Sequence, residues 1–307
     1  MSTGREEGGG IRRAIYAGPG AMNGAPVTHV LIWVNVAIFA LEVLKQGSLS
    51  ALVDVSNDVS RLFGANGPSL TFHAHHYESL LTSCFAHGSL LHVALNMYAL
   101  RQVGPLVEPS AGGARFSVMY VLSGIVASLT SATWSEATGN PLLSVGASGA
   151  ICGVMGAAVV VAVRVHGWRS SIAWDVGLWL GLTLIYGATS QHVDNAAHVG
   201  GMIAGCATAL AWRRGVVETT SKRVRWVGAS ALLCLGCMGV TAWRDFHDPF
   251  AVEGPTDRSS DVTRALEDHD CVAARRALRA VEAVPPSDSE LEGLRQAVDE
   301  RCPRPPR

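Results

Sequence analysis

Long apolar segments, separated by short links that hold most of the charge, make up most of the first 243 residues of this 307-residue chain. Seven of them are long enough to cross a bilayer, which takes roughly 17–25 residues of α-helix. Only 16% of the residues are charged, compared with about 25% in ordinary soluble domains. We therefore expect an all-α integral membrane protein whose spans are residues 28–45, 79–100, 116–134, 143–163, 176–192, 195–212 and 226–243.

Lys and Arg residues are distributed unequally between the two sides of the predicted membrane. Twelve lie in the N-terminal segment and in the links after the even-numbered spans, and three lie near the edge of the other side. Because positive residues are retained in the cytoplasm, we expect the N-terminus inside and the C-terminus outside. The predicted parts are a cytoplasmic N-terminal tail (1–27), a six-span core (28–212), a basic cytoplasmic link (213–225), a seventh span (226–243) and an extracytoplasmic tail (244–307).

The termini and the composition restrict the location and the partners further. Residues 1–26 are polar and rich in glycine, and the first apolar run lacks a small-residue cleavage site, so we expect no cleavable signal. High contents of Ala, Gly and Arg suggest a bacterial inner membrane. The net charge of −1 predicts no nucleic-acid partner.

The polar tail, residues 244–307, differs in kind from the rest, with 14 acidic residues against 10 basic ones. Residues 270–284 and 287–301 have the composition of two short helices, and the Pro-Pro pair between them forces a turn. If the two helices fold back on each other, Cys271 lies near Cys302. A disulfide can form there outside the cytoplasm, and two free thiols in a loosely ordered tail are the alternative. The sequence identifies no partner for this tail.

Four polar side chains fall in the outer parts of the even-numbered spans. Ser148 lies in the first turns of the fourth span and His198 in the first turn of the sixth. His92 and Asn96 are four residues apart, so they share one face of the second span. Even-numbered spans all run from outside to inside, which places Ser148 and His198 at similar depth and all four residues in the outer half of the membrane. Polar groups inside a membrane are costly and are functional candidates.

Ser148 and His198 are chemically suited to nucleophilic catalysis. Gly146 and Gly149 flank Ser148 and permit close backbone approach, while free N–H groups at a helix start can bind an oxyanion. A neutral imidazole at His198 can accept the serine proton and return it to a leaving amine.

Each of these features also has a simpler explanation in helix packing. The glycines around Ser148 can be a small-residue packing motif, and His198 can be an interfacial histidine bonded to backbone. Gly201 belongs to a Gly-x-x-x-Gly face that would press the sixth span against a neighbour. Ser144 is a competing nucleophile with fewer glycines around it.

Other histidines raise the alternative of a metal site in the first outer loop. His73, His75 and His76 are close in sequence, but only Glu78 has a convincing spacing as a further ligand. The seven cysteines show no zinc-like spacing. We therefore expect no metal and no cofactor, and we interpret His87 as a structural group that hydrogen-bonds the loop.

The joint pattern resembles the rhomboid family of intramembrane serine proteases. The matching stretches are residues 81–97, Gly104 with Glu108, 146–149 and 197–201, which follow in the family's order on the expected helices. The resemblance covers roughly residues 28–212. A seventh span after a six-helix core is a known arrangement in the family.

The resemblance implies a function and a role for each matching residue. Ser148 is similar to the family's nucleophile and His198 to its general base and acid, without an acidic third member. His92, Asn96 and the backbone N–H of Ser148 are similar to its oxyanion hole. The implied activity is cleavage of single-span membrane protein substrates within the lipid bilayer, near its outer face. A catalytically inactive, client-binding relative is the alternative; a transporter should show internal repeats, and none is convincing here.

Two positions depart from the family's pattern. Glu78-Ser79 stands where a Trp-Arg pair is frequent in the first loop. Cys152 stands four residues after Ser148, where an aromatic residue often stacks on the catalytic histidine. The resemblance therefore leaves open how the outer loop is packed and what supports His198.

Overall fold

The structure is a computed structural model, and it describes residues 24–139, 142–190, 193–212, 219–247, 262–267, 269–283 and 288–302. The described chain is helical, with turns and loops and no named strand within these ranges. Most of the predicted N-terminal tail and about half of the predicted basic link lie outside the described residues.

Five described helices are long and apolar enough to cross a membrane. They are α2 (Pro26–Gln46), α6 (Gly113–Thr138), α7 (Ser148–His166), α8 (Ser171–Thr189) and α10 (Thr220–His247). Two further helices, α5 (Leu90–Ala111) and α9 (Asn195–Ala211), are not among the five. The all-α membrane fold is thus confirmed, whereas the number of seven spans stays a prediction.

The second predicted span differs from the structure at its start. The chain forms a single helical turn, α4 (Ser79–Thr82), and then leaves the helix until α5 begins at Leu90. Ser89 caps α5 by accepting a hydrogen bond from the His92 N–H at 3.1 Å. Before it, the backbone N–H of the fully buried His87 donates to the Glu42 carboxylate of α2. One local hydrogen bond and one to α2 thus lie in the loop that separates α4 from α5, within a stretch that the sequence predicts as one helix.

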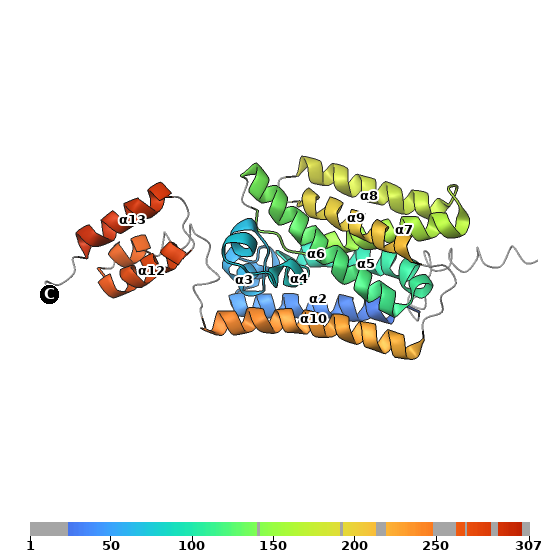
Figure 1. Cartoon of the computed structure of the whole chain (residues 1–307), viewed down its shortest axis with the longest axis horizontal. Coiled ribbons are helices and arrows are strands. Elements are labelled where there is room, and N and C mark those ends of the chain that lie inside the picture. The colour runs from blue at the N-terminus through green and yellow to red at the C-terminus, as the bar shows by residue number, and fades with distance from the viewer. Residues whose placement is uncertain are drawn as a thin grey trace, which may run out of the picture.

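Short elements connect α2 to α5 at one end of the bundle (Figure 1). They are η2 (Leu49–Leu52), α3 (Asn57–Leu62), η3 (Ser69–His73) and α4. In Figure 1 the helices of residues 24–247 lie side by side, with α2 and α10 along one side and α8 along the opposite side. Helix α7 packs against α5, α6, α8 and α9, which makes it the central helix of the bundle.

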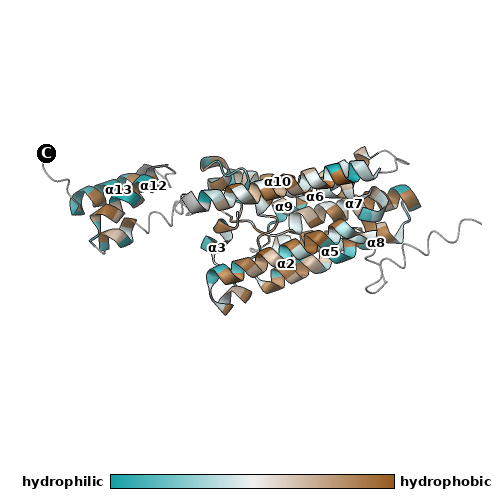
Figure 2. Cartoon of the chain, turned by 90° about the horizontal axis from the view of Figure 1, so that it is seen from below, coloured by the Kyte–Doolittle hydropathy of each residue, from teal (hydrophilic) through white to brown (hydrophobic). Residues whose placement is uncertain are grey.

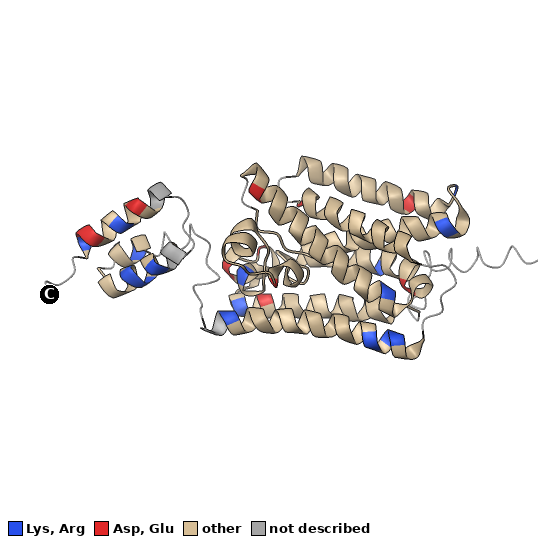
Figure 3. Cartoon of the chain, viewed as in Figure 1, with Lys and Arg blue, Asp and Glu red and all other residues tan. Residues whose placement is uncertain are grey.

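The outward faces of the bundle are apolar, as a lipid environment requires. Trp33 on α2, Leu178 on α8 and Leu232 on α10 are each more than 60% exposed, and Figure 2 shows hydrophobic residues along these helices. Figure 3 shows charged residues gathered toward the helix ends, with few in the middle of the bundle. The chain is therefore an integral, multi-pass membrane protein.

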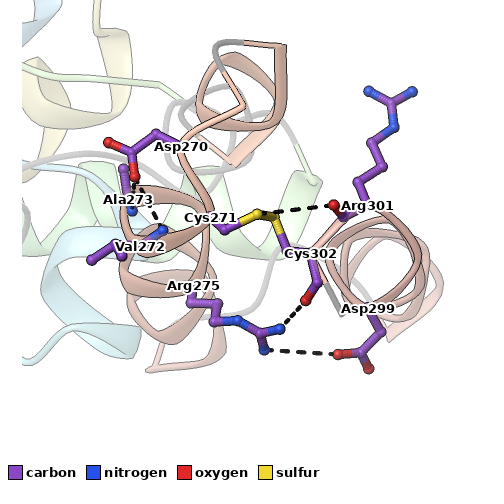
Figure 4. The surroundings of a disulfide bond; sticks show 8 residues. All are labelled: Asp270, Cys271, Val272, Ala273, Arg275, Asp299, Arg301 and Cys302. Atoms are coloured by element: carbon purple, nitrogen blue, oxygen red, sulfur yellow. Dashed lines mark hydrogen bonds and ion pairs between the residues drawn. A yellow bond between two sulfur atoms is a disulfide. The ribbon is translucent and has the colours of Figure 1, made fainter. Parts of the chain in front are cut away.

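The described part of the tail has a small core of its own, built by a helical segment at 262–267 and by α12 (Cys271–Ala283) and α13 (Asp288–Arg301). Val281 of α12 and Val298 of α13 are completely buried. A disulfide joins Cys271 to Cys302, with 5.4 Å between their Cα atoms (Figure 4). The Pro-Pro pair that the sequence places between the helices lies outside the described residues.

Candidate active site

Ser148 is the first residue of α7, and the segment before it is positioned by backbone contacts. Gly146 has a φ of +118°, which L side chains rarely adopt, and its N–H donates to the Ser83 carbonyl at 2.8 Å. A Cβ at Gly146 would lie 2.7 Å from the His92 ring and 3.5 Å from the Asn96 Nδ2. Glycine is therefore required for this segment to lie against the two side chains of α5.

His198 and Ser148 are hydrogen-bonded to each other. The His198 Nε2 lies 2.9 Å from the Ser148 Oγ. His198 is 4% exposed, and its backbone N–H donates to the Asp194 carbonyl in the first turn of α9. Its Nδ1 has no hydrogen-bond partner in the described part of the chain. Ser148 and His198 thus form a serine–histidine pair, and no carboxylate among the described residues is hydrogen-bonded to the His198 ring.

Asn96 presents a buried donor beside the same segment. Its Nδ2 is buried and finds no hydrogen-bond acceptor among the described residues, which is uncommon and calls for an explanation. The N–H groups of Ser148 and Gly149 also have no carbonyl partner within α7, because the first residues of a helix never do. The His92 ring and the Asn96 Nδ2 both lie close to Gly146, two residues before Ser148, so these donors are near the start of α7.

Close packing of α7 against α9 brings the pair together. A Cβ at Gly201 would lie 1.9 Å from the Gly149 carbonyl oxygen, and one at Gly205 would lie 1.9 Å from that of Gly153. The Gly-x-x-x-Gly face of α9 therefore contacts the backbone of α7 directly. Cys152, one turn after Ser148 on α7, is 2% exposed and belongs to the main apolar core.

Two polar residues near the site have roles that the sequence did not reveal. The Ser144 Oγ donates to the Asp194 Oδ2 at 2.6 Å, so the competing nucleophile is bonded to a carboxylate in place of a histidine. The Asp194 Oδ1 caps α9 by accepting from the Ala197 N–H at 2.9 Å. The sequence could have indicated the cap, because an aspartate directly before a helical segment is a typical N-cap residue. It gave no indication of the bond to Ser144, which lies 50 residues away.

Two histidines of the segment between α3 and α4 have other partners. His73 lies 3.3 Å from Glu136, and the His75 Nδ1 lies 2.9 Å from the Tyr77 hydroxyl. No group of three or more His, Cys, Asp or Glu side chains within the described ranges is placed to hold a metal ion.

His87 lies in the loop before α5, near the candidate site. Its Nδ1 donates to the Phe85 carbonyl at 3.1 Å, and its ring is edge-on to that of His92. Burial lowers the pKa of His87 to about 3, and the neighbouring His92 adds to this shift. The ring is therefore neutral and serves as a structural group beside the candidate site.

Glu78, the first departure from the family's pattern, also has a partner. Its carboxylate pairs with Arg244 at the end of α10, and both side chains are mostly buried, at 11% and 12% exposed. The segment that leads into α4 is therefore attached to the last long helix of the bundle at the position where the Trp-Arg pair is missing.

Comparison with known proteins gives a consistent result. A family model described as "Rhomboid domain" matches residues 74–215. Similar proteins include Rhomboid protease GluP of Bacillus subtilis (strain 168), 32% identical over 191 residues, which are 62% of this chain and 35% of that protein. Rhomboid protease AarA of Providencia stuartii is 29% identical over 208 residues, which are 61% of this chain and 72% of that protein. RHOMBOID-like protein 1 of Arabidopsis thaliana is 31% identical over 174 residues, or 54% and 42% of the two chains.

The matched region is the part of the chain that builds the candidate site. It contains the starts of α5, α7 and α9, on which the four polar residues lie. The match spans about a third of the Bacillus protein and less than half of the Arabidopsis protein. By its family match, its relatives and its helical membrane fold, this chain contains a rhomboid domain in residues 74–215.

Proposed function

We propose that this protein is an intramembrane serine endopeptidase that cuts single-span membrane proteins with a Ser148–His198 dyad. The observation that carries the proposal is the 2.9 Å contact between the His198 Nε2 and the Ser148 Oγ, formed at the start of two helices. The unpartnered amide of Asn96 beside it supports the proposal. So do the relatives whose names describe them as rhomboid proteases.

In the proposed reaction the Ser148 Oγ attacks the carbonyl carbon of the substrate peptide bond. The His198 Nε2 accepts the serine proton and then donates it to the leaving amine. The oxyanion receives hydrogen bonds from the Ser148 N–H, the Asn96 Nδ2 and the His92 ring. Water then hydrolyses the acyl-enzyme, with His198 acting again as base. The substrate helix has to unwind locally, since an intact helix hides its peptide bonds.

The alternative function is client binding without cleavage, and turnover separates the two. The purified protein is reconstituted in liposomes with an excess of a single-span membrane protein that carries tags on both ends. The proposal predicts two fragments in an amount that exceeds the amount of enzyme. A protein that only binds clients yields a stable complex and no fragments, and that result would overturn the proposal.

Asn96→Ala is expected to lower kcat by about 10²–10³-fold with little change in KM, because its amide binds charge that exists only in the transition state. The measurement is the rate of fragment formation at several substrate densities in the membrane. Asn35→Ala is the matched control, since Asn35 is fully buried on α2 and donates within its own helix to Leu31. If both variants lose the same amount of activity, Asn96 has no specific part in the reaction.

We propose that the tail lies outside the cytoplasm, most simply across a bacterial inner membrane, which places the dyad near the outer face. The Cys271–Cys302 disulfide supports this orientation because the cytoplasm keeps thiols reduced. In intact spheroplasts, brief reduction followed by a membrane-impermeant maleimide is expected to label both cysteines. Labelling that appears only after the membrane is permeabilised would place the tail inside.

A further inference from the structure

The starts of α7 and α9 are joined to each other one helical turn before the dyad. Ser144 precedes Ser148 by four residues, and Asp194 precedes His198 by four. The Ser144 Oγ donates a 2.6 Å hydrogen bond to the Asp194 Oδ2. This bond therefore connects two residues that each precede a member of the dyad by four positions. On the other side of the dyad, Gly149 and Gly201 are in direct contact.

Ser144 is itself held in a fixed place. Its N–H donates to the Asn66 carbonyl at 2.7 Å, and its carbonyl accepts from the Asn66 N–H at 2.9 Å. Asn66 is completely buried, and its Nδ2 donates to the Ser128 carbonyl of α6 at 2.8 Å. Thr71 donates a further hydrogen bond to the Asn66 Oδ1 at 2.6 Å. Ser144, the residue that Asp194 contacts, is thus connected through Asn66 to α6.

Asp194 uses both carboxylate oxygens and its carbonyl for three different contacts. Its Oδ2 accepts from Ser144, and its Oδ1 accepts from the Ala197 N–H and caps α9. Its carbonyl accepts from the backbone N–H of His198 at 3.2 Å. A continuous set of hydrogen bonds therefore runs from α6 through Asn66, Ser144 and Asp194 to the histidine.

We propose that Ser144 and Asp194 are positioning residues for the dyad: their hydrogen bond fixes the distance and the angle between the His198 ring and the Ser148 hydroxyl. This inference rests on the proposed protease function and adds to it. Neither residue touches the substrate in this account. Reaction rates depend steeply on such geometry, and a misplacement of about 1 Å can cost about a hundredfold.

The test compares kcat and KM of Ser144→Ala, Asp194→Ala, Asp194→Asn and the double alanine variant. Ser144→Ala is expected to lower kcat on the order of tenfold, and Asp194→Ala by about 10- to 100-fold, with KM unchanged. Asp194→Asn should stay within about threefold of wild type, because asparagine caps helices as well as aspartate does and its second amide atom can still bond Ser144. The double variant should be no slower than Asp194→Ala, since both substitutions remove the same hydrogen bond.

Ser170→Ala is the matched control. Ser170 caps α8 by accepting from the Ala173 N–H, as Asp194 caps α9, but it lies before a helix that carries no member of the dyad. The control is expected to lose thermal stability and keep kcat. If Ser144→Ala and Asp194→Ala have the same kcat as Ser170→Ala while the wild type cleaves, the inference is overturned and the protease function stands.

Hydrogen exchange gives a second readout that does not depend on cleavage. In Ser144→Ala, amides of the first turn of α9 are expected to exchange faster, although every residue of α9 is unchanged. In Asp194→Ala, faster exchange is expected in the first turn of α7 as well as in α9. If the protein cleaves nothing, the proposed function fails, and exchange still decides whether the two helix starts are coupled. Exchange that changes only within the mutated segment would contradict the coupling.

Discussion

Replacing Ser148 with alanine is expected to reduce cleavage of a single-span substrate by about 10⁴-fold or more. The proposed nucleophile is then absent, and the oxyanion donors alone provide only the small remainder of catalysis seen when a serine protease loses its serine. The fold should be unaffected, because the Ser148 side chain is partly exposed and its only described side-chain hydrogen bond is to His198. Initial rates in liposomes, at matched protein levels, measure the effect.

Ser144→Ala is the informative comparison for this variant. Ser144 lies close by in sequence, but its hydroxyl is bonded to Asp194, so its removal is expected to cost only about tenfold. The expected losses of cleavage rate for Ser148→Ala and Ser144→Ala therefore differ by about three orders of magnitude. Equal losses, or a larger loss at Ser144, would mean that the nucleophile has been assigned to the wrong serine.

Gly201→Leu is expected to produce the second largest effect, on both stability and activity. Even a Cβ at this position would lie 1.9 Å from the Gly149 carbonyl oxygen, which is backbone and cannot turn aside. The larger side chain must push α9 away from α7, at a cost of about 3 kcal/mol or more in unfolding free energy. Because Ser148 and His198 lie on these two helices, cleavage should fall at least about a hundredfold.

Gly181→Leu provides the control for this change. Gly181 lies on the membrane-spanning helix α8, and a Cβ there meets nothing within 4 Å. Leucine also has a higher helix propensity than glycine, a difference of at most about 1 kcal/mol. Thermal unfolding in detergent together with cleavage rates should therefore separate the two variants clearly. A Gly201→Leu protein as stable as Gly181→Leu would contradict the direct contact between α7 and α9.

Much of the fold follows from the spacing of apolar segments in the sequence. The predicted spans and the observed helices agree closely for α2 and α9, where charged or polar residues mark both ends. The start of α5 could not be predicted in this way. It depends on hydrogen bonds that Ser89 and Glu42 make locally and across helices, and hydropathy contains no information about such contacts.

The candidate site was predictable in part, for a physical reason. Ser148, His198, His92 and Asn96 could be placed in the outer half of the membrane because all four lie on spans that are predicted to run in one direction. Contacts between separate segments could not be read from one sequence. The Ser144–Asp194 hydrogen bond and the Glu78–Arg244 ion pair join residues far apart in the chain, and each residue alone looked like part of a polar link.

The covalent adduct of a fluorophosphonate, mapped by mass spectrometry of peptides, tests the central assignment most directly. Such reagents phosphonylate an activated serine and leave ordinary serines unmodified, so the adduct identifies the nucleophile without knowledge of the substrate. A Ser148–His198 dyad predicts one adduct on Ser148 in the wild type and its loss in His198→Ala. An adduct on another serine, or labelling of Ser148 that is unchanged in His198→Ala, would contradict the dyad.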